Sequence, residues 1–191
     1  MLKRHDLPNF KVLPWSVDTQ RLLNCFKNFK AMYDPVSSEY GPEYFSDDYE
    51  QMTLSQMTDD KTIRGRIDER NYSELIPEFK KTYLEEILNN FKSPYTRVRL
   101  INKKPGSYIL PHMDYDSTYS VRYFIPLQTN PWAFTAIERD SKVEIQNLKI
   151  GNVYFVNVGF KHSAWNFGST DDIRLIVSVN GQLDLGENND F

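Results

Sequence analysis

The eight residues Ile-Arg-Leu-Ile-Val-Ser-Val-Asn at positions 173–180 decide how the second half of this chain folds. Successive side chains of a β-strand point to opposite faces, so this run divides into two different surfaces. One surface is wholly apolar and the other is mixed: the apolar positions are Ile173, Leu175, Val177 and Val179, and the mixed positions are Arg174, Ile176, Ser178 and Asn180. We expect the apolar surface to pack under helices from the N-terminal half, which turns Arg174 towards the interior of a barrel.

Residues 95–181 contain further short runs of β-branched and aromatic residues, separated by turn signals such as Pro-Gly, Gly-Asn and Gly-Ser. The clearest runs are Arg97–Ile101, Tyr119–Leu127 and Val153–Val158. Several short strands at this spacing are typical of a sandwich or a barrel. The sequence therefore predicts a mainly β fold for this half of the chain.

The first half of the chain has helical periodicity in two places. Between Asp18 and Lys30 apolar residues recur at helical spacing, and either Ser16 or Asp18 is suited to cap the first turn. A second helix is expected over Ser73–Phe91, where the apolar stripe consists of Leu75, Phe79, Tyr83, Ile87 and Leu88. The intervening segment Asp34–Tyr72 is polar and broken by Pro and Gly, so we expect extended or looped structure that forms either a substrate-contacting wall or an ordinary surface wrap.

A chain of 191 residues and 22.5 kDa has the size of one domain, so we expect a single unit over residues 1–191. Within it, residues 1–93 are expected to form a part with helices and loops that packs on the barrel. Residues 94–181 are expected to form the β core, and residues 182–191 a tail that is acidic and frayed from Gly186 onwards.

Charge and composition narrow the possible functions. The 23 Lys and Arg residues against 26 Asp and Glu residues give a net charge of -3, which provides no broad cationic surface for nucleic acid or anionic lipid. No apolar stretch approaches the length needed to span a bilayer. Cys25 is the only cysteine, which excludes an internal disulfide and a multi-thiolate metal site. We therefore expect a cytoplasmic protein that binds neither nucleic acid nor membrane.

Three histidines occur in the chain, and two of them, His112 and His162, lie in strand-like sequence. Asp114 follows His112 by two positions, so both side chains project from the same face of a strand. His162 can return on another strand as a third ligand. Two neutral imidazoles and one carboxylate form the set that binds non-haem Fe(II) with open coordination positions. The alternative is a strand histidine hydrogen-bonded to a neighbouring carboxylate, while His5 is expected to be an exposed terminal residue.

Arginines provide a second kind of signal. An isolated arginine that faces a barrel interior is costly, so Arg174 implies an anionic partner. Its guanidinium can pair bidentately with the far carboxylate of an organic co-substrate that chelates the metal. The alternative is a structural cation paired with an interior Asp. Arg97 and Arg99 share a strand face, for which we favour a solvated surface over an anion-binding one.

Four segments together carry a resemblance to a known family: Arg99–Asp116, Val121–Leu127, His162–Asn166 and Ile173–Leu175. In combination they resemble the aspartyl/asparaginyl β-hydroxylase family, which includes proline hydroxylases and belongs to the Fe(II)- and 2-oxoglutarate-dependent oxygenases. The resemblance covers about half of the chain. It implies a double-stranded β-helix, the jelly-roll fold also found in cupins, preceded here by N-terminal helices.

The resemblance also implies roles for individual residues. His112, Asp114 and His162 would ligate iron, and Arg174 would hold the distal carboxylate of 2-oxoglutarate. Members often have Arg-x-His-x-Pro where this chain reads Arg-Tyr-Phe-Ile-Pro at positions 122–126. Phe124 thus replaces a histidine that would help hold the co-substrate, and Arg122 on the same strand face is expected to serve instead.

The activity implied is hydroxylation of a C–H bond by a dioxygenase that uses Fe(II), 2-oxoglutarate and dioxygen, with ascorbate as a supporting reductant. The substrate would be a free amino acid such as proline, or an Asp, Asn or Pro residue in a peptide. No catalytic residue is expected beyond the metal centre. Two alternatives are a jelly-roll module that binds metal or a small acid without turnover, and an isomerase or dioxygenase that uses the same metal set without 2-oxoglutarate.

Overall fold

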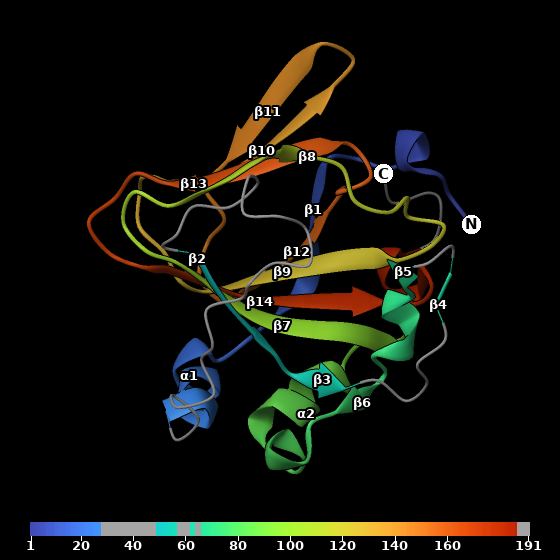
Figure 1. The fold of residues 1–191 in the computed structure, drawn as a ribbon, viewed down its shortest axis with the longest axis vertical. Helices are drawn as coiled ribbons and strands as arrows, with labels where there is room; N and C mark the ends of the chain where they lie inside the picture. Colours follow the sequence, from blue (N-terminus) through green and yellow to red (C-terminus); the bar gives the residue numbers. More distant parts are fainter. Residues whose placement is uncertain (28–48, 57–61, 64–65, 187–191) are drawn as a thin grey trace.

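Two antiparallel sheets face one another in the computed structural model, which describes residues 1–27, 49–56, 62–63 and 66–186 (Figure 1). The larger sheet has six strands in the order β1-β12-β9-β14-β7-β2, and the smaller has four in the order β11-β10-β13-β8. The six strands are β1 (Phe10–Ser16), β2 (Tyr49–Thr53), β7 (Tyr95–Lys103), β9 (Val121–Gln128), β12 (Asn152–Val156) and β14 (Asp172–Val179). The four are β8 (Tyr108–His112), β10 (Ala133–Arg139), β11 (Lys142–Gln146) and β13 (Lys161–Asn166).

Helices and short ladders complete the described fold. The helices are α1 (Thr19–Lys27) and α2 (Tyr83–Leu88), and single 3-10 turns are η1 (Arg4–Asp6), η4 (Glu69–Asn71), η5 (Pro77–Phe79) and η6 (Leu183–Leu185). Two-residue ladders pair β3 (Ser55–Gln56) with β6 (Glu74–Leu75) and β4 (Thr62–Ile63) with β5 (Arg66–Ile67). No helix within these described ranges is long and apolar enough to cross a membrane.

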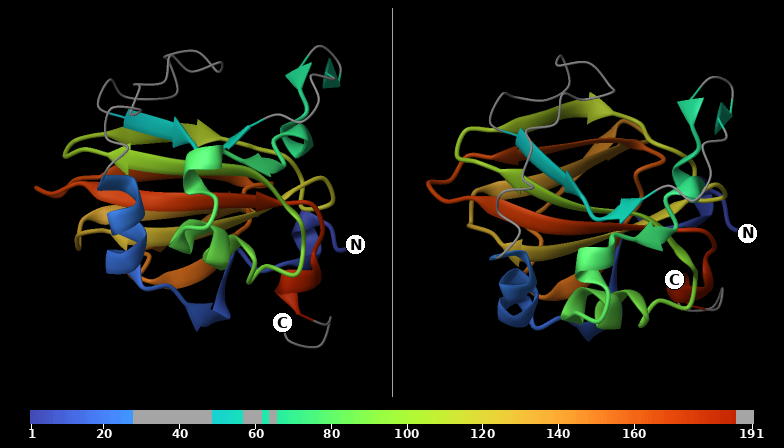
Figure 2. Two further views of the ribbon diagram at one scale, coloured as in Figure 1. Left: turned by 90° about the horizontal axis from the view of Figure 1, so that it is seen from below. Right: turned by 60° about the horizontal axis from the view of Figure 1, so that its bottom comes forward.

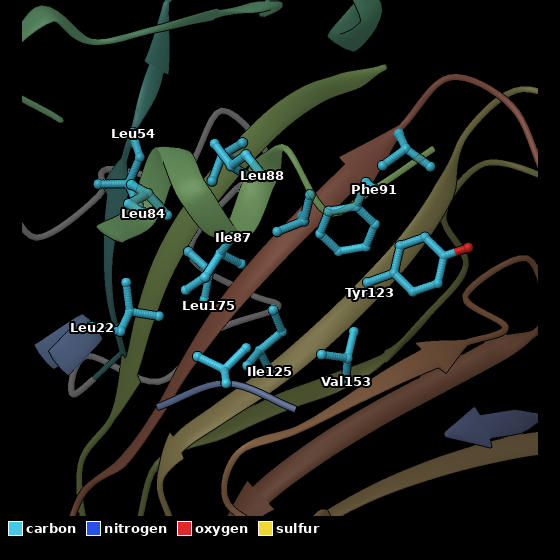
Figure 3. Packing of buried hydrophobic residues seen from close by; sticks show 14 of the residues in the cluster. Leu22, Leu54, Leu84, Ile87, Leu88, Phe91, Tyr123, Ile125, Val153 and Leu175 are labelled. Atoms are coloured by element: carbon cyan, nitrogen blue, oxygen red, sulfur yellow. The ribbon is translucent and has the colours of Figure 1, made fainter. Parts of the chain in front are cut away.

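Strand β14 lies in the interior of the six-stranded sheet, between β7 and β9. Its apolar face belongs to a large cluster of buried side chains beneath α1 and α2, where Leu175, Val177 and Val179 are fully buried. Figure 3 shows Leu175 surrounded by Leu22, Leu84 and Ile87, which come from these helices. Both helices cover the side of the sheet that faces away from the smaller sheet (Figures 1 and 2). The prediction that the apolar face of this strand packs under the N-terminal helices is confirmed.

The opposite face of the six-stranded sheet looks towards the four-stranded sheet. A second apolar cluster fills part of this interior and includes Ile101, Phe124, Ile176 and, from the smaller sheet, Ile137. Because Val98 and Leu100 belong to the outer cluster, alternation along β7 turns Arg97, Arg99, Ile101 and Lys103 inwards. The fold class predicted from the sequence, a mainly β double-stranded β-helix of the jelly-roll type, is confirmed.

The helix predicted over Ser73–Phe91 is wrong in its first half. The chain there forms β6 and then η5, and only Tyr83–Leu88 is α-helical. Leu75 is drawn into the ladder with β3, where Ser55 is its partner, and Lys81 adopts a left-handed backbone with φ 60°. The apolar stripe is nevertheless buried at Leu75, Phe79, Ile87 and Leu88. The periodicity therefore identified residues of the core, while ladder pairing overrode their helical propensity.

Two other sequence predictions can be compared with the described residues. The first helix is present as α1, and the carboxylate of Asp18, rather than Ser16 at the end of β1, accepts a hydrogen bond from the amide of Arg21 at 3.0 Å. Within Asp34–Tyr72, where extended or looped structure is expected, the described residues include the extended edge strand β2, whereas residues 34–48, 57–61 and 64–65 lie outside the described residues.

The C-terminal tail is ordered at its start. Leu185 is buried, and the carboxylate of Asp184 accepts hydrogen bonds from the amides of Lys92 and Ser93 at 2.7 and 3.0 Å. The turn η6 thus docks on the core, while the tail boundary at residue 182 stays a prediction. Residues 187–191 lie outside the described residues, and the division into 1–93 and 94–181 stays a prediction.

The burial of β14 gives a test of the fold. Leu175→Ala is expected to lower the free energy of unfolding by about 2 to 5 kcal/mol, because it removes a fully buried side chain between the sheet and the helices. Leu183→Ala is the matched control, since Leu183 is 64% exposed, and it is expected to change that free energy by no more than about 0.5 kcal/mol. Urea denaturation measures both, and equal effects would contradict this packing.

Candidate metal centre

His112, Asp114 and His162 converge at one point, with one ligand atom from each residue lying within 4.8 Å of the other two. Strand pairing produces this arrangement, because β8 and β13 are antiparallel neighbours and place His112 directly opposite His162. Their ring centroids are 4.3 Å apart. Asp114 follows the end of β8, and its amide donates to the carbonyl of Val158 at 3.0 Å, which fixes the backbone behind the carboxylate.

Backbone carbonyls orient both imidazoles. The Nδ1 atom of His112 lies 2.7 Å from the carbonyl oxygen of Leu110, and the Nδ1 atom of His162 lies 3.1 Å from that of Phe160. A carbonyl only accepts hydrogen bonds, so in each ring Nδ1 donates and Nε2 is the nitrogen available to a metal ion. The Nε2 atom of His162 lies 3.6 Å from the carboxylate of Asp114. Both rings thus present the tautomer that a metal ligand requires.

The protonation states match the same requirement. Burial lowers the pKa of His162 to about 4, against the opposing effect of Asp114, so the ring is neutral at pH 7. Burial acts to raise the pKa of Asp114, but Arg122 and then His162 outweigh it and lower that pKa to about 2. The carboxyl group is therefore ionised. Neutral imidazoles and an ionised carboxylate on one face are the donor set of divalent non-haem iron sites, and these residues fit such an ion.

Arg122 lies directly behind the carboxylate of the triad. It is 6% exposed and donates through Nη1 to Oδ2 of Asp114 and through Nη2 to Oε2 of Glu69, the latter at 2.9 Å. Arg122 stands on the inner face of β9, and Glu69 belongs to η4. One guanidinium thus joins a candidate metal ligand to the segment that precedes the β core. Sequence reasoning placed Arg122 near the co-substrate but did not identify Glu69.

A second polar cluster lies at the other end of the same interior. Arg174 donates through Nε to Oδ1 of Asp172 at 3.1 Å, and its Nη2 lies 2.9 Å from Oδ2 of the same carboxylate. Lys103 of β7 also forms an ion pair with Asp172, and Arg174 reaches across to the hydroxyl of Thr135 in the smaller sheet. Lys103, Asp172 and Arg174 are each 0% exposed. We name these three residues the buried ionic cluster.

The two polar groups face the same space between the sheets. Thr135, which contacts Arg174, and Ile137 lie on the inner face of β10, and Ile137 stands opposite His162 in the register. Two residues along a strand correspond to about 7 Å. Apolar side chains of the inner cluster, among them Phe124 and Ile176, occupy the sheet face between the two ends. An apolar interior therefore has a metal-type donor set near one end and excess positive charge at the other.

The structure brings together the residues singled out from the sequence, with two differences. Arg174 faces inwards as predicted, and it is paired with an interior Asp, the alternative considered for it, but Lys103 adds a second cation. Arg97 and Arg99 are half-buried on the inner face, so the favoured prediction of a solvated face is wrong. Alternation along β7 could have indicated this burial, because Arg97, Arg99 and Lys103 share a strand face with the apolar Ile101, which is buried between the sheets.

Comparison with known proteins agrees with this site and fold. The family model for aspartyl/asparaginyl beta-hydroxylase matches residues 62–181. A 2OG-Fe(II) oxygenase family oxidoreductase from Burkholderia pseudomallei superposes with a TM-score of 0.60 at 14% identity, covering 91% of this chain and 85% of that one. A prolyl-4-hydroxylase from Pseudomonas putida superposes with a TM-score of 0.56 at 11% identity, covering 90% and 91%. At these identities the two structures show a shared fold.

The jelly-roll fold together with the family match shows an oxidoreductase of the hydroxylase type. The match over residues 62–181 places the chain in the aspartyl/asparaginyl β-hydroxylase family, as its sequence segments suggested.

Arg122 provides a test of the electrostatics of this site. Arg122→Met leaves the buried carboxylate of Glu69 and the partly buried carboxylate of Asp114 without their shared cation. We expect the free energy of unfolding of the metal-free protein to fall by about 3 to 5 kcal/mol, and Glu69→Gln in the same variant to restore part of it. Arg21→Met breaks the Arg21–Glu86 pair, whose side chains are 53% and 55% exposed, and is expected to cost less than about 1 kcal/mol. Equal losses in urea denaturation would contradict the buried pairing.

Proposed function

We propose that this protein is an Fe(II)- and 2-oxoglutarate-dependent dioxygenase that hydroxylates a C–H bond of a small amino-acid substrate. The observation that carries the proposal is the pairing of His112 and His162 across β8 and β13 with Asp114 beside them. Membership of the hydroxylase family supports the reaction class. The buried ionic cluster supports a dicarboxylate co-substrate, because it holds two cations and one carboxylate.

We assign His112, Asp114 and His162 as the metal ligands. Bound ferrous iron would supply the redox chemistry by which dioxygen is reduced and 2-oxoglutarate is oxidised to succinate and carbon dioxide. The protein contributes the fixed tautomers of two imidazoles and a carboxylate held ionised by Arg122. His162 is already neutral and Asp114 already ionised, as binding of a divalent ion requires.

We assign Arg174 to the distal carboxylate of 2-oxoglutarate. Its guanidinium can donate to a carboxylate with two parallel hydrogen bonds. We keep the assignment of Arg122 to the metal-binding end of the co-substrate. Because Arg122 contacts Asp114 directly, we also assign it the role of positioning Asp114. The apolar side chains between these ends exclude water from the reacting groups, which strengthens each electrostatic contact inside.

Residues around Arg122 favour a free amino acid over a peptide residue as the substrate. Arg97 and Arg99 are half-buried on the inner face of β7, where they can receive a carboxylate. Glu69 is 3% exposed, and its Oε1 atom has no hydrogen-bond partner among the residues that the structure describes. A buried acceptor of this kind is suited to an ammonium or imino group. Proline and similar free amino acids carry both charges, whereas a residue within a peptide carries neither on its backbone.

The single cysteine, Cys25, is a free thiol and agrees with the proposed location of the enzyme in the cytoplasm. Ascorbate would act only as a supporting reductant in the assay.

Metal binding tests the ligand assignment. His112→Ala and His162→Ala are each expected to lose Fe(II) binding while remaining folded, since the apolar burial of the β core does not depend on a metal. Anaerobic calorimetry with Fe(II) measures binding, and circular dichroism measures folding. His5→Ala is the control, because His5 lies outside the triad and should leave metal affinity unchanged. Full Fe(II) affinity in either triad variant, or global unfolding of it, would refute the assignment.

Turnover tests the reaction. Iron-dependent formation of succinate from 2-oxoglutarate is expected with a free amino acid, and excess Zn(II) should inhibit it because zinc binds such nitrogen and oxygen ligands more tightly than ferrous iron. The substrate panel contains free amino acids and peptides with Asp, Asn or Pro. Arg174→Ala should abolish succinate formation. If the amino acid were instead consumed equally well by wild type and by Arg174→Ala without any succinate, the metal set would be working without 2-oxoglutarate, and no turnover across the panel would favour a non-catalytic binding module.

A further inference from the structure

The buried ionic cluster holds more positive than negative charge. Arg174 and Lys103 both pair with the one carboxylate of Asp172, and all three side chains are 0% exposed. Thr135, the other polar partner of Arg174, is neutral. Among the described residues, the contacts of this cluster therefore leave one positive charge without a partner. A buried charge without a counter-ion is costly, and proteins keep such charges mainly where a ligand neutralises them.

Within the part of the chain that the structure describes, the surroundings of Lys103 provide no second carboxylate. On β14 it faces Asp172 and Arg174, and on β2 the residue opposite in the register is Tyr49. Glu50 and Asp171 both bind the side chain of Asn102, which belongs to the opposite face of β7, and Glu50 also pairs with Lys104. The nearby acidic groups of the described residues thus have other partners, so the charge of this cluster suits a negatively charged ligand.

We propose that Lys103 is a second cation for the distal carboxylate of the co-substrate, so that this carboxylate is bound between Lys103 and Arg174 while Asp172 holds both cations in place. This inference rests on the proposed function and extends it to a residue that sequence reasoning did not identify. Its consequence is specificity. Binding a carboxylate makes the cluster neutral, with two positive and two negative charges, whereas a 2-oxo acid that lacks the distal carboxylate leaves the excess charge buried.

The same cluster makes co-substrate binding depend on pH. Burial and then Arg174 lower the pKa of Lys103 to about 8, although Asp172 opposes this. A bound carboxylate favours the protonated amine. Affinity for the dicarboxylate is therefore expected to be constant below pH 8 and to fall as the pH rises through that value, by up to about tenfold per pH unit.

The experiment compares two ligands that differ only at the far end. Zn(II)-loaded protein at pH 7 is titrated calorimetrically with 2-oxoglutarate and with 2-oxovalerate, which has a methyl group where 2-oxoglutarate has its distal carboxylate. Zinc prevents turnover, so the readout is binding alone. In Lys103→Met the preference for 2-oxoglutarate is expected to fall by about 10- to 100-fold, the loss of one charge-assisted contact, with the affinity for 2-oxovalerate unchanged.

Lys104→Met is the matched control, because Lys104 is the neighbouring lysine, is 42% exposed at its side chain and pairs with Glu50 outside the cluster. It should keep the full preference and the pH dependence of the wild type. Lys103→Met should remain folded without ligand, since the remaining Asp172–Arg174 pair is neutral, and its binding of 2-oxoglutarate should no longer weaken above pH 8. If Lys103→Met does not fold, Lys103→Gln is used in its place. The fall in 2-oxoglutarate affinity above pH 8 is also tested on the wild-type protein alone.

Each outcome separates this inference from the proposed function. A preference for 2-oxoglutarate that survives in Lys103→Met but disappears in Arg174→Ala would overturn the role of Lys103 and leave the dioxygenase proposal standing. An equal loss of both ligands in Lys103→Met would also overturn it, because that result indicates general damage to the site. Wild-type protein that binds zinc but neither 2-oxo acid would instead reject the proposed co-substrate itself.

Discussion

Strand β14 must bury both of its faces, and the rest of the structure depends on how it does so. One face is apolar and packs under α1 and α2, which leaves the other to carry Arg174 into the space between the sheets. A buried guanidinium cannot be left alone in an apolar interior. Polar groups therefore surround Arg174 in the interior: Asp172 lies beside it on β14, Lys103 lies on the next strand and Thr135 lies on the opposite sheet.

The metal-type donor set arises from a different constraint, the register between two strands of the smaller sheet. Antiparallel pairing sets His112 against His162, and backbone carbonyls then fix the tautomer of each ring. Asp114 stays ionised because Arg122 outweighs the effect of burial. Each sheet thus supplies one part of the site: the smaller sheet carries the imidazoles, and the larger sheet carries the cations that hold carboxylates.

Sequence reasoning succeeded where alternation or a short motif carried the information. The strands over 95–181 and the inward turn of Arg174 follow from a period of two residues, whereas the His-x-Asp pair was a short motif whose Asp114 lies beyond the end of β8. It failed over Ser73–Phe91, because Leu75 pairs with a distant strand that no local pattern reveals. Extended structure was expected where edge strand β2 lies, but its pairing with β7 was not predicted for the same reason.

The sequence by itself predicted a mainly β fold, and its resemblance to a known family added the jelly-roll class, three candidate metal ligands and Arg174 as a candidate for binding a carboxylate, because residue types, alternation and short motifs can be read directly from the chain. Only the tertiary structure decided which charges meet. Lys103 and Asp172 form an ion pair although they are 69 residues apart in the sequence, the same separation as that between Asn102 and Asp171 beside them. Glu69 and Arg122 pair across 53 residues. Electrostatic partners in a β fold are set by strand register and sheet packing, which are non-local, so a list of residues cannot give the net charge of the interior they enclose.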